Sequence, residues 1–285
     1  MPKGISVHVG LNKVDPAHYD GWDGELAACE FDAKDMAALA KARKFKPKTL
    51  LTKQATAAAV IGALTDAAGQ LKTGDFLLFT YSGHGGQIPD KNGDEKDRLD
   101  ETWVLYDREL IDDELYGIWS LFAPGVRIFV LSDSCHSGTV TRGRLYEAMV
   151  TNPAIGELAA PTIPRFRVMP GQVNDPGSLQ NRVYTKNKEL YDGIQKRTRA
   201  GDKVAVNASI LLISGCQDNQ LSADGNRNGL FTQMLLKVWN KGKFTGGYTK
   251  FHRAIAEKMP PWQSPNFYRA GASDARFEAE SPFSL

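Results

Sequence analysis

Short apolar runs alternate with longer segments of helical periodicity along most of the 285-residue chain. The apolar runs predict buried strands at residues 4–11, 49–52, 76–79, 101–106, 128–131 and 208–214. The periodic segments predict helices at residues 25–44, 55–71, 112–122, 229–240 and 248–259. This alternation predicts an α/β fold, with a mainly parallel central β-sheet flanked by helices on both faces.

The composition changes between residues 139 and 204, where proline, glycine, asparagine and basic residues replace the apolar runs. We expect a long surface insertion there, and a candidate processing region. The chain is therefore read as a single domain with three regions. These are residues 1–138, the insertion at 139–204 and a C-terminal region at 205–285.

Two of the apolar runs end in a histidine and a cysteine. The run at residues 76–79 leads into Ser82, Gly83 and His84, and the run at 128–131 leads into Asp133 and Cys135. Chemistry in parallel sheets collects beyond the carboxyl ends of the strands. If the two strands are neighbours, His84 and Cys135 face one crevice. Side chains alternate along a strand, so Ser82 and Asp133 would point to the same side as their reactive neighbours.

A cysteine beside a histidine suits nucleophilic catalysis. The thiolate attacks a carbonyl, and the imidazole activates the thiol and then protonates a leaving amine. The resulting oxyanion needs backbone N–H donors, and we expect those of Gly85 and Cys135, which lie in tight turns at the strand ends.

Plainer interpretations of these residues stay open at this point. A buried cysteine at a strand end is often only a small apolar side chain. His84, Cys135 and His136 would give three zinc ligands, but no further spaced ligand completes a tetrahedral site, so we expect no metal there. His136 would point away from Cys135 in an extended chain, and Asp133 could simply cap a turn.

Bulk properties exclude several classes of partner. The net charge of +2 argues against nucleic acid, and no apolar run approaches the length of a membrane span. Three cysteines are too few for a disulfide framework, which favours a reducing compartment. We expect a cytoplasmic monomer that does not bind nucleic acid or membranes.

The segments around His84 and Cys135 resemble the two catalytic signatures of metacaspases, which are caspase-like cysteine peptidases of bacteria, plants, fungi and protists. Further segments similar to the family follow in the same order, at residues 26–33, 92–95, 100–101, 107, 214–224 and 263–265. The resemblance is to the bacterial type without a prodomain, and it implies a caspase-like sandwich fold. It covers nearly the whole chain except the insertion.

The resemblance also implies an activity. Cys135 would be the nucleophile, His84 the general base and acid, and the substrates proteins or peptides cut after arginine or lysine. Carboxylates matching Asp32 and Asp133 would bind the basic side chain, and Cys29 and Ser82 would line the pocket. Paired carboxylates suit a guanidinium, and they would repel the acidic side chains that caspases take.

Calcium and self-processing remain open. Many metacaspases need calcium, yet Arg142 stands where the family has an aspartate ligand. The acidic loop at residues 90–101 still offers oxygen ligands, so no cofactor is assigned. An enzyme with this specificity could cut its own insertion after one of five basic residues: Arg142, Arg144, Lys188, Arg197 or Arg199. Two other functions stay open, namely a non-catalytic adaptor that binds basic peptides and a cysteine hydrolase of different specificity.

Overall fold

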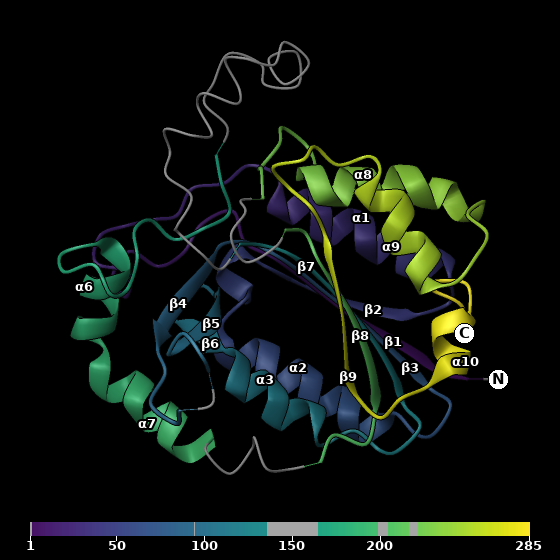
Figure 1. Cartoon of the computed structure of the whole chain (residues 1–285), viewed down its shortest axis with the longest axis horizontal. Coiled ribbons are helices and arrows are strands. Elements are labelled where there is room, and N and C mark those ends of the chain that lie inside the picture. The colour runs from purple at the N-terminus through teal and green to yellow at the C-terminus, as the bar shows by residue number, and fades with distance from the viewer. Residues whose placement is uncertain (1, 94, 136–164, 199–204, 217–221) are drawn as a thin grey trace.

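The computed structural model describes residues 2–93, 95–135, 165–198, 205–216 and 222–285. A six-stranded sheet lies at its centre, in the order β2-β1-β3-β7-β8-β9 (Figure 1). Its strands are β1 (Gly4–Gly10), β2 (Lys46–Leu51), β3 (Phe76–Ser82), β7 (Arg127–Asp133), β8 (Ser209–Ser214) and β9 (Asn266–Gly271). All neighbours are parallel except β8 and β9, which confirms the predicted mainly parallel sheet.

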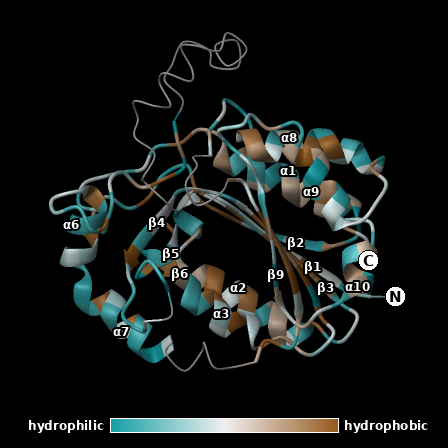
Figure 2. Cartoon of the chain, in the orientation of Figure 1, coloured by the Kyte–Doolittle hydropathy of each residue, from teal (hydrophilic) through white to brown (hydrophobic). Residues whose placement is uncertain are grey.

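The three strands β1, β3 and β7 are buried along their whole length. Strands covered on both faces read as continuous apolar runs, which is why the sequence predicted them. Figure 2 shows this apolar sheet between helices whose outer surfaces are more polar.

Helices cover both faces of the sheet. On one face, α2 (Ala57–Gln70) and α3 (Asp112–Trp119) pack against apolar side chains of β1, β3 and β7. On the other face lie α1 (Cys29–Ala42), α8 (Leu230–Trp239), α9 (Tyr248–Ala256) and α10 (Ala275–Ala279). The predicted α/β sandwich is therefore confirmed, and within the described parts of the chain no helix is long and apolar enough to cross a membrane.

A second, antiparallel sheet was not predicted. It is formed by β4 (Gly85–Pro89), β5 (Leu99–Val104) and β6 (Glu109–Ile111). The strand expected at residues 101–106 is therefore β5 and lies outside the central sheet. Strand β4 begins directly after His84. The small sheet is therefore joined to the end of β3 by only two residues.

The insertion is only partly a surface segment, which corrects the sequence-based expectation. Residues 179–198 form α6 (Leu179–Lys186) and α7 (Lys188–Thr198), which lie beside the small sheet (Figure 1). Their buried side chains Val183, Tyr191 and Ile194 pack against apolar residues of the rest of the chain. Arg167 and Met169 are fully buried as well. A few well-spaced apolar residues are sufficient to anchor these helices, although they form no apolar run.

Candidate active site

The sheet brings the two predicted reactive residues to one edge. Strands β3 and β7 are parallel neighbours, and Ser82 pairs in register with Asp133. His84 and Cys135 each lie two residues further along, and both side chains are buried. The sheet topology thus supplies the neighbouring strands that the prediction required.

The imidazole of His84 is held in one orientation. Its Nε2 lies 3.0 Å from the carbonyl oxygen of Gly24, and the ring lies against Trp22. Since a carbonyl only accepts, Nε2 carries the proton. Burial lowers the pKa of His84 to about 4, against an opposing effect of the backbones of Gly24 and Val168. The ring is therefore neutral at pH 7, with its lone pair on Nδ1.

Neither reactive side chain is hydrogen-bonded to the other. Nδ1 of His84 is buried and has no hydrogen-bond partner among the described residues. The sulfur of Cys135 accepts a hydrogen bond from the backbone N–H of Ser222. A segment from the insertion, residues 165–169, lies against this region instead.

The carbonyl group of Arg167 occupies the site between the two strand ends. Its oxygen accepts hydrogen bonds from the backbone N–H groups of Gly85 and Cys135, both at 3.0 Å. These are the two amides that the sequence predicted as oxyanion donors. The structure therefore brings them together on one carbonyl oxygen that belongs to an arginine.

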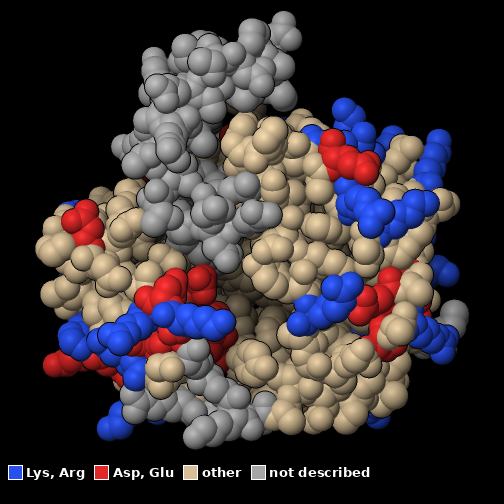
Figure 3. Space-filling model, in the orientation of Figure 1, with Lys and Arg blue, Asp and Glu red and all other residues tan. Residues whose placement is uncertain are grey.

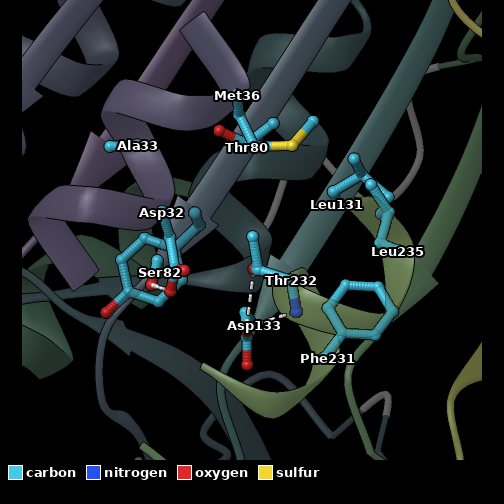
Figure 4. Close-up of a pocket in the computed structure, with 11 residues that line it drawn as sticks. Asp32, Ala33, Met36, Thr80, Ser82, Leu131, Asp133, Phe231, Thr232 and Leu235 are labelled. Carbon is cyan, nitrogen blue, oxygen red and sulfur yellow. Dashed lines mark hydrogen bonds between the residues drawn. The ribbon is translucent and has the colours of Figure 1, made fainter. Parts of the chain in front are cut away.

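The guanidinium of Arg167 lies in a fully buried pocket of carboxylates. Its nitrogens lie 2.7 Å from Asp32, 2.9 Å from Asp133 and 2.9 Å from Asp224, and Nη1 donates to the Ser82 hydroxyl at 2.8 Å. Asp32, Ser82 and Asp133 also line a small neighbouring pocket, whose lining does not include Arg167 (Figure 4). Three predicted pocket residues are thus gathered around one arginine side chain.

The electrostatics of this cluster are strongly coupled. Burial raises the pKa of Asp32 to about 6, although Arg167 acts in the opposite direction. Burial alone would lower the pKa of Arg167, but the surrounding carboxylates raise it above its usual value. Burial also raises the pKa of the predicted pocket residue Cys29, with Arg167 and Ser82 opposing this effect. The guanidinium is therefore charged, and Cys29 stays a neutral thiol beside it.

Three carboxylates around one cation need further donors, because a buried charge without partners is costly. The hydroxyls of Ser222 and Thr232 each donate a hydrogen bond to Asp133. Asp32 accepts from the Gly229 N–H, and Asp224 accepts from the N–H groups of Ala27 and Ala28. Each carboxylate of the pocket thus accepts hydrogen bonds from other groups besides the Arg167 side chain.

The backbone of the segment is held as an added strand on both sides of Arg167. The N–H of Arg167 donates to Ser222 at 3.0 Å, and the N–H of Asp224 donates to Arg165 at 2.8 Å. On the other side, the N–H of Met169 donates to Gly85 at 2.8 Å. Pairing of an extended peptide with a protein strand is a common way to bind peptide ligands.

Comparisons with known proteins assign the chain to a family. The sequence model of the caspase domain matches residues 14–275. Metacaspase-1A of Aspergillus fumigatus is 31% identical over 249 residues, which cover 79% of this chain and 57% of that protein. The chain belongs to the metacaspase-type branch of the caspase family. Metacaspase-1 of Mycosarcoma maydis is 31% identical over 267 residues, covering 82% of this chain and 61% of that protein. The chain thus spans about three fifths of the length of these metacaspases.

Solved structures support the same family fold. A crystal structure of a Geobacter sulfurreducens protein is 52% identical, with a TM-score of 0.85 and 99% of both chains covered. Caspase-1 of Spodoptera frugiperda has a TM-score of 0.51 at 11% identity, covering 95% of this chain and 86% of that one. The second likeness concerns the fold alone and places this metacaspase-type chain on a caspase-like framework.

Two residues of the site were missed by the sequence analysis. Asp224 lies in a segment noted for its family resemblance, but nothing in the sequence alone showed that its carboxylate would reach the pocket. Arg167 lies in the segment expected on the surface. The sequence Arg-Phe-Arg-Val-Met at 165–169 combines basic with apolar residues and was the available signal. His136 falls outside the described residues.

A separate carboxylate cluster lies in the acidic loop region. Oxygens of Glu95, Glu101 and Asp112 lie within 4.8 Å of one another. Burial, with the neighbouring acids Glu101, Asp100 and Asp113, raises the pKa of Asp112. In Figure 3, acidic side chains gather beside the small sheet. Such crowded oxygen ligands suit a hard divalent cation such as calcium, which would relieve the repulsion. Arg142 lies outside the described residues.

Proposed function

We propose that this chain is a cysteine endopeptidase that cuts peptide bonds after arginine or lysine. One observation carries the proposal. Arg167 places its carbonyl oxygen on two backbone donors and its guanidinium among three carboxylates at the same time. A substrate arginine in this position would present its carbonyl next to Cys135.

The proposed reaction uses the two strand-end residues. His84 takes the thiol proton of Cys135 through Nδ1, and the sulfur attacks the substrate carbonyl carbon. The oxyanion is stabilised by the N–H groups of Gly85 and Cys135. His84 then protonates the leaving amine as the C–N bond breaks, which leaves a thioester. Water, deprotonated by His84, then attacks the thioester carbon and the C–S bond breaks. The sulfur of Cys135 takes the proton back from His84, and the carboxylic acid product leaves.

The specificity follows from the charge of the pocket. Three carboxylates attract an arginine or lysine side chain, and arginine can bind more than one of them through its planar fork. An aspartate side chain would add a fourth buried negative charge. We therefore expect arginine to be preferred over lysine, and aspartate to be excluded.

We further propose that the chain cuts itself after Arg167. The Arg167–Val168 bond already lies across the site, whereas Lys188 and Arg197 lie in the helix α7. A helical peptide cannot pair with a strand edge in extended form. The other candidates, Arg142, Arg144 and Arg199, fall outside the described residues.

Fluorogenic peptides ending in arginine, lysine, aspartate or asparagine test the specificity, with calcium and with a chelator in parallel. The reduced wild type should cut arginine and lysine peptides, and Cys135→Ala should cut none. Cleavage of the aspartate peptide alone would overturn the pocket assignment. Failure to cut any peptide, together with binding of basic peptides, would favour the adaptor function.

Intact mass measured over time tests the self-cleavage. The wild type should yield fragments of residues 1–167 and 168–285. Arg167→Ala and Cys135→Ala should abolish these fragments, while the matched control Arg197→Ala should keep them. Fragments that persist in Arg167→Ala would place the cut elsewhere.

A further inference from the structure

The two residues before Arg167 have their own contacts on the protein. Nη2 of Arg165 lies 3.3 Å from a carboxylate oxygen of Glu25, and Nη1 donates to the Glu25 carbonyl oxygen at 3.4 Å. Phe166 packs against the apolar cluster of Cys135 and Cys216, and Trp262 packs against the same cluster. Nothing in the family resemblance assigned Glu25 or Trp262.

The backbone pairing fixes where these side chains go. The carbonyl oxygen of Arg165 accepts from the N–H of Asp224, and the N–H of Arg167 donates to Ser222. Phe166, between them, forms an antiparallel bridge with Ala223. These bonds use only main-chain atoms, so any extended peptide can make them. Alternate side chains of a strand point to opposite sides, which separates Phe166 from its two basic neighbours. A peptide substrate bound in the same register would therefore meet the same surfaces.

We propose that Glu25 and Trp262 form two further substrate subsites, so that the preferred substrate is a basic–aromatic–arginine sequence. This inference rests on the proposed function, because it concerns the residues before the cut bond. Glu25 selects a basic side chain two residues before the cleaved arginine. Trp262, with Cys216, selects an apolar or aromatic side chain directly before it. The segment at 165–167 is thus a copy of the preferred substrate.

The two subsites should differ in strength. The side chains of Arg165 and Glu25 are each 52% exposed, and an exposed ion pair contributes little. We expect an arginine there to be preferred over a glutamate by about fivefold to tenfold. Phe166 is partly buried against the apolar cluster, and we expect phenylalanine to be preferred over glycine by about tenfold.

The experiment uses the full-length Arg167→Ala variant, in which the chain's own arginine no longer competes for the pocket. Four fluorogenic peptides are compared by kcat/KM: Arg-Phe-Arg, Glu-Phe-Arg, Arg-Gly-Arg and Gly-Gly-Arg. The first should be cut fastest. The same four peptides are given to the processed wild type. If neither protein cuts any of them, the proposed function fails; if all are cut at equal rates, only the subsite inference fails.

Two substitutions in this background assign the residues. Glu25→Lys should invert the preference between Arg-Phe-Arg and Glu-Phe-Arg, because the charge that faces the side chain is reversed. The matched control Asp23→Lys makes the same change in a carboxylate that pairs with Lys13 rather than with Arg165. If both substitutions change the preference equally, the effect comes from the overall charge of this surface, and the proposed Glu25 subsite is wrong.

Trp262→Ala tests the second subsite. It should reduce the preference for phenylalanine over glycine by about fivefold and leave the preference between arginine and glutamate unchanged. A uniform loss across all four peptides would contradict a selective role for Trp262. If either variant does not fold, the peptide series on the Arg167→Ala variant still decides whether the preference exists.

Discussion

The third carboxylate, Asp224, changes what the pocket can distinguish. Asp32 and Asp133 lie on different elements, α1 and β7, and Asp224 comes from the segment that also pairs with the peptide backbone. Asp224 therefore binds the arginine side chain through its carboxylate and the main chain of the same segment through its N–H. Its two bonds to the N–H groups of Ala27 and Ala28 fix its position even when no arginine is bound.

Asp224→Asn should lower kcat/KM for arginine peptides about 10- to 100-fold, because one charge-assisted hydrogen bond to the guanidinium is lost. The amide can still accept from one backbone N–H, so the fold should persist. The matched control Asp35→Asn removes a carboxylate that contacts Arg227 and Asn228 but not Arg167, and it should have little effect. If kcat/KM falls equally in both variants, Asp224 has no specific role in binding arginine. Steady-state kinetics with circular dichroism as a fold check provide the measurement.

The covered imidazole of His84 predicts two different pH dependences. With residues 165–169 in place, burial holds the pKa of His84 at about 4, so the base stays neutral and self-cleavage should keep its rate down to about pH 5. Once the segment has left, water reaches the ring and the pKa should rise towards its usual value of about 6.5. Cleavage of added peptides by processed enzyme should then fall as the pH drops through about 6. If the rates of self-cleavage and of peptide cleavage fall at the same pH, the predicted change in the pKa of His84 is wrong.

At the scale of the elements, burial decides what the sequence could predict. The central strands β3 and β7 are covered on both faces, so each contains a continuous apolar run whose end could be located, with His84 and Cys135 a few residues beyond. Strand β4 is short and begins with two glycines, and the helices α6 and α7 bury only a few side chains each. Such elements are defined by tertiary contacts rather than by periodicity.

The residues of the arginine pocket also differ in how far the sequence could predict them. Asp32, Ser82 and Asp133 could be assigned because a family resemblance marked them, and the alternation along a strand supported two of them. Asp224 and Arg167 lie on irregular segments whose position depends on long-range pairing. The sequence alone could not place them, because no local pattern sets the direction of such a segment.

The carboxyl group of Glu109 predicts a pH-dependent contact between β6 and α7. Burial raises its pKa to about 7, with hydrogen bonds from Thr102 and Tyr191 opposing the shift. The folded state therefore binds a proton more tightly than the unfolded chain. Between pH 4.5 and pH 7, stability should fall as the pH rises, by up to about 3 kcal/mol.

Glu109→Gln should remove this component, because the amide keeps the shape but does not titrate. Urea denaturation at several pH values would show a smaller decrease in the free energy of unfolding for the variant than for the parent, both in the Cys135→Ala background. Glu114→Gln is a suitable control, since Glu114 pairs with Arg108 near the surface of the same region. Parallel pH profiles for Glu109→Gln and the parent would contradict the assignment.

At the scale of the whole molecule, the chain binds its own insertion in the place where a substrate would lie. Residues 165–169 are held between Ser222–Asp224 and β4, and the helices α6 and α7 follow directly and are anchored on the small sheet. Tethering makes this binding intramolecular, so a free peptide must compete with a very high effective concentration. The uncut chain should therefore turn over added peptides slowly.

The same arrangement makes Arg167 a structural residue of the uncut protein. In the Cys135→Ala background, where no cut can occur, Arg167→Ala leaves three carboxylates without their cation. We expect the free energy of unfolding at pH 7 to fall by up to about 3 kcal/mol, the low end for breaking a buried ion pair, because water can enter the vacated pocket. The unpaired carboxylates then have raised pKa values, so the folded state takes up protons on acidification and part of the lost stability should return between pH 7 and pH 5.

Urea denaturation at the two pH values measures both effects. The control is Arg165→Ala, which removes an exposed arginine of the same segment. A pH-independent difference between Arg167→Ala and its parent would show that the loss arises from packing rather than from the charges of the pocket.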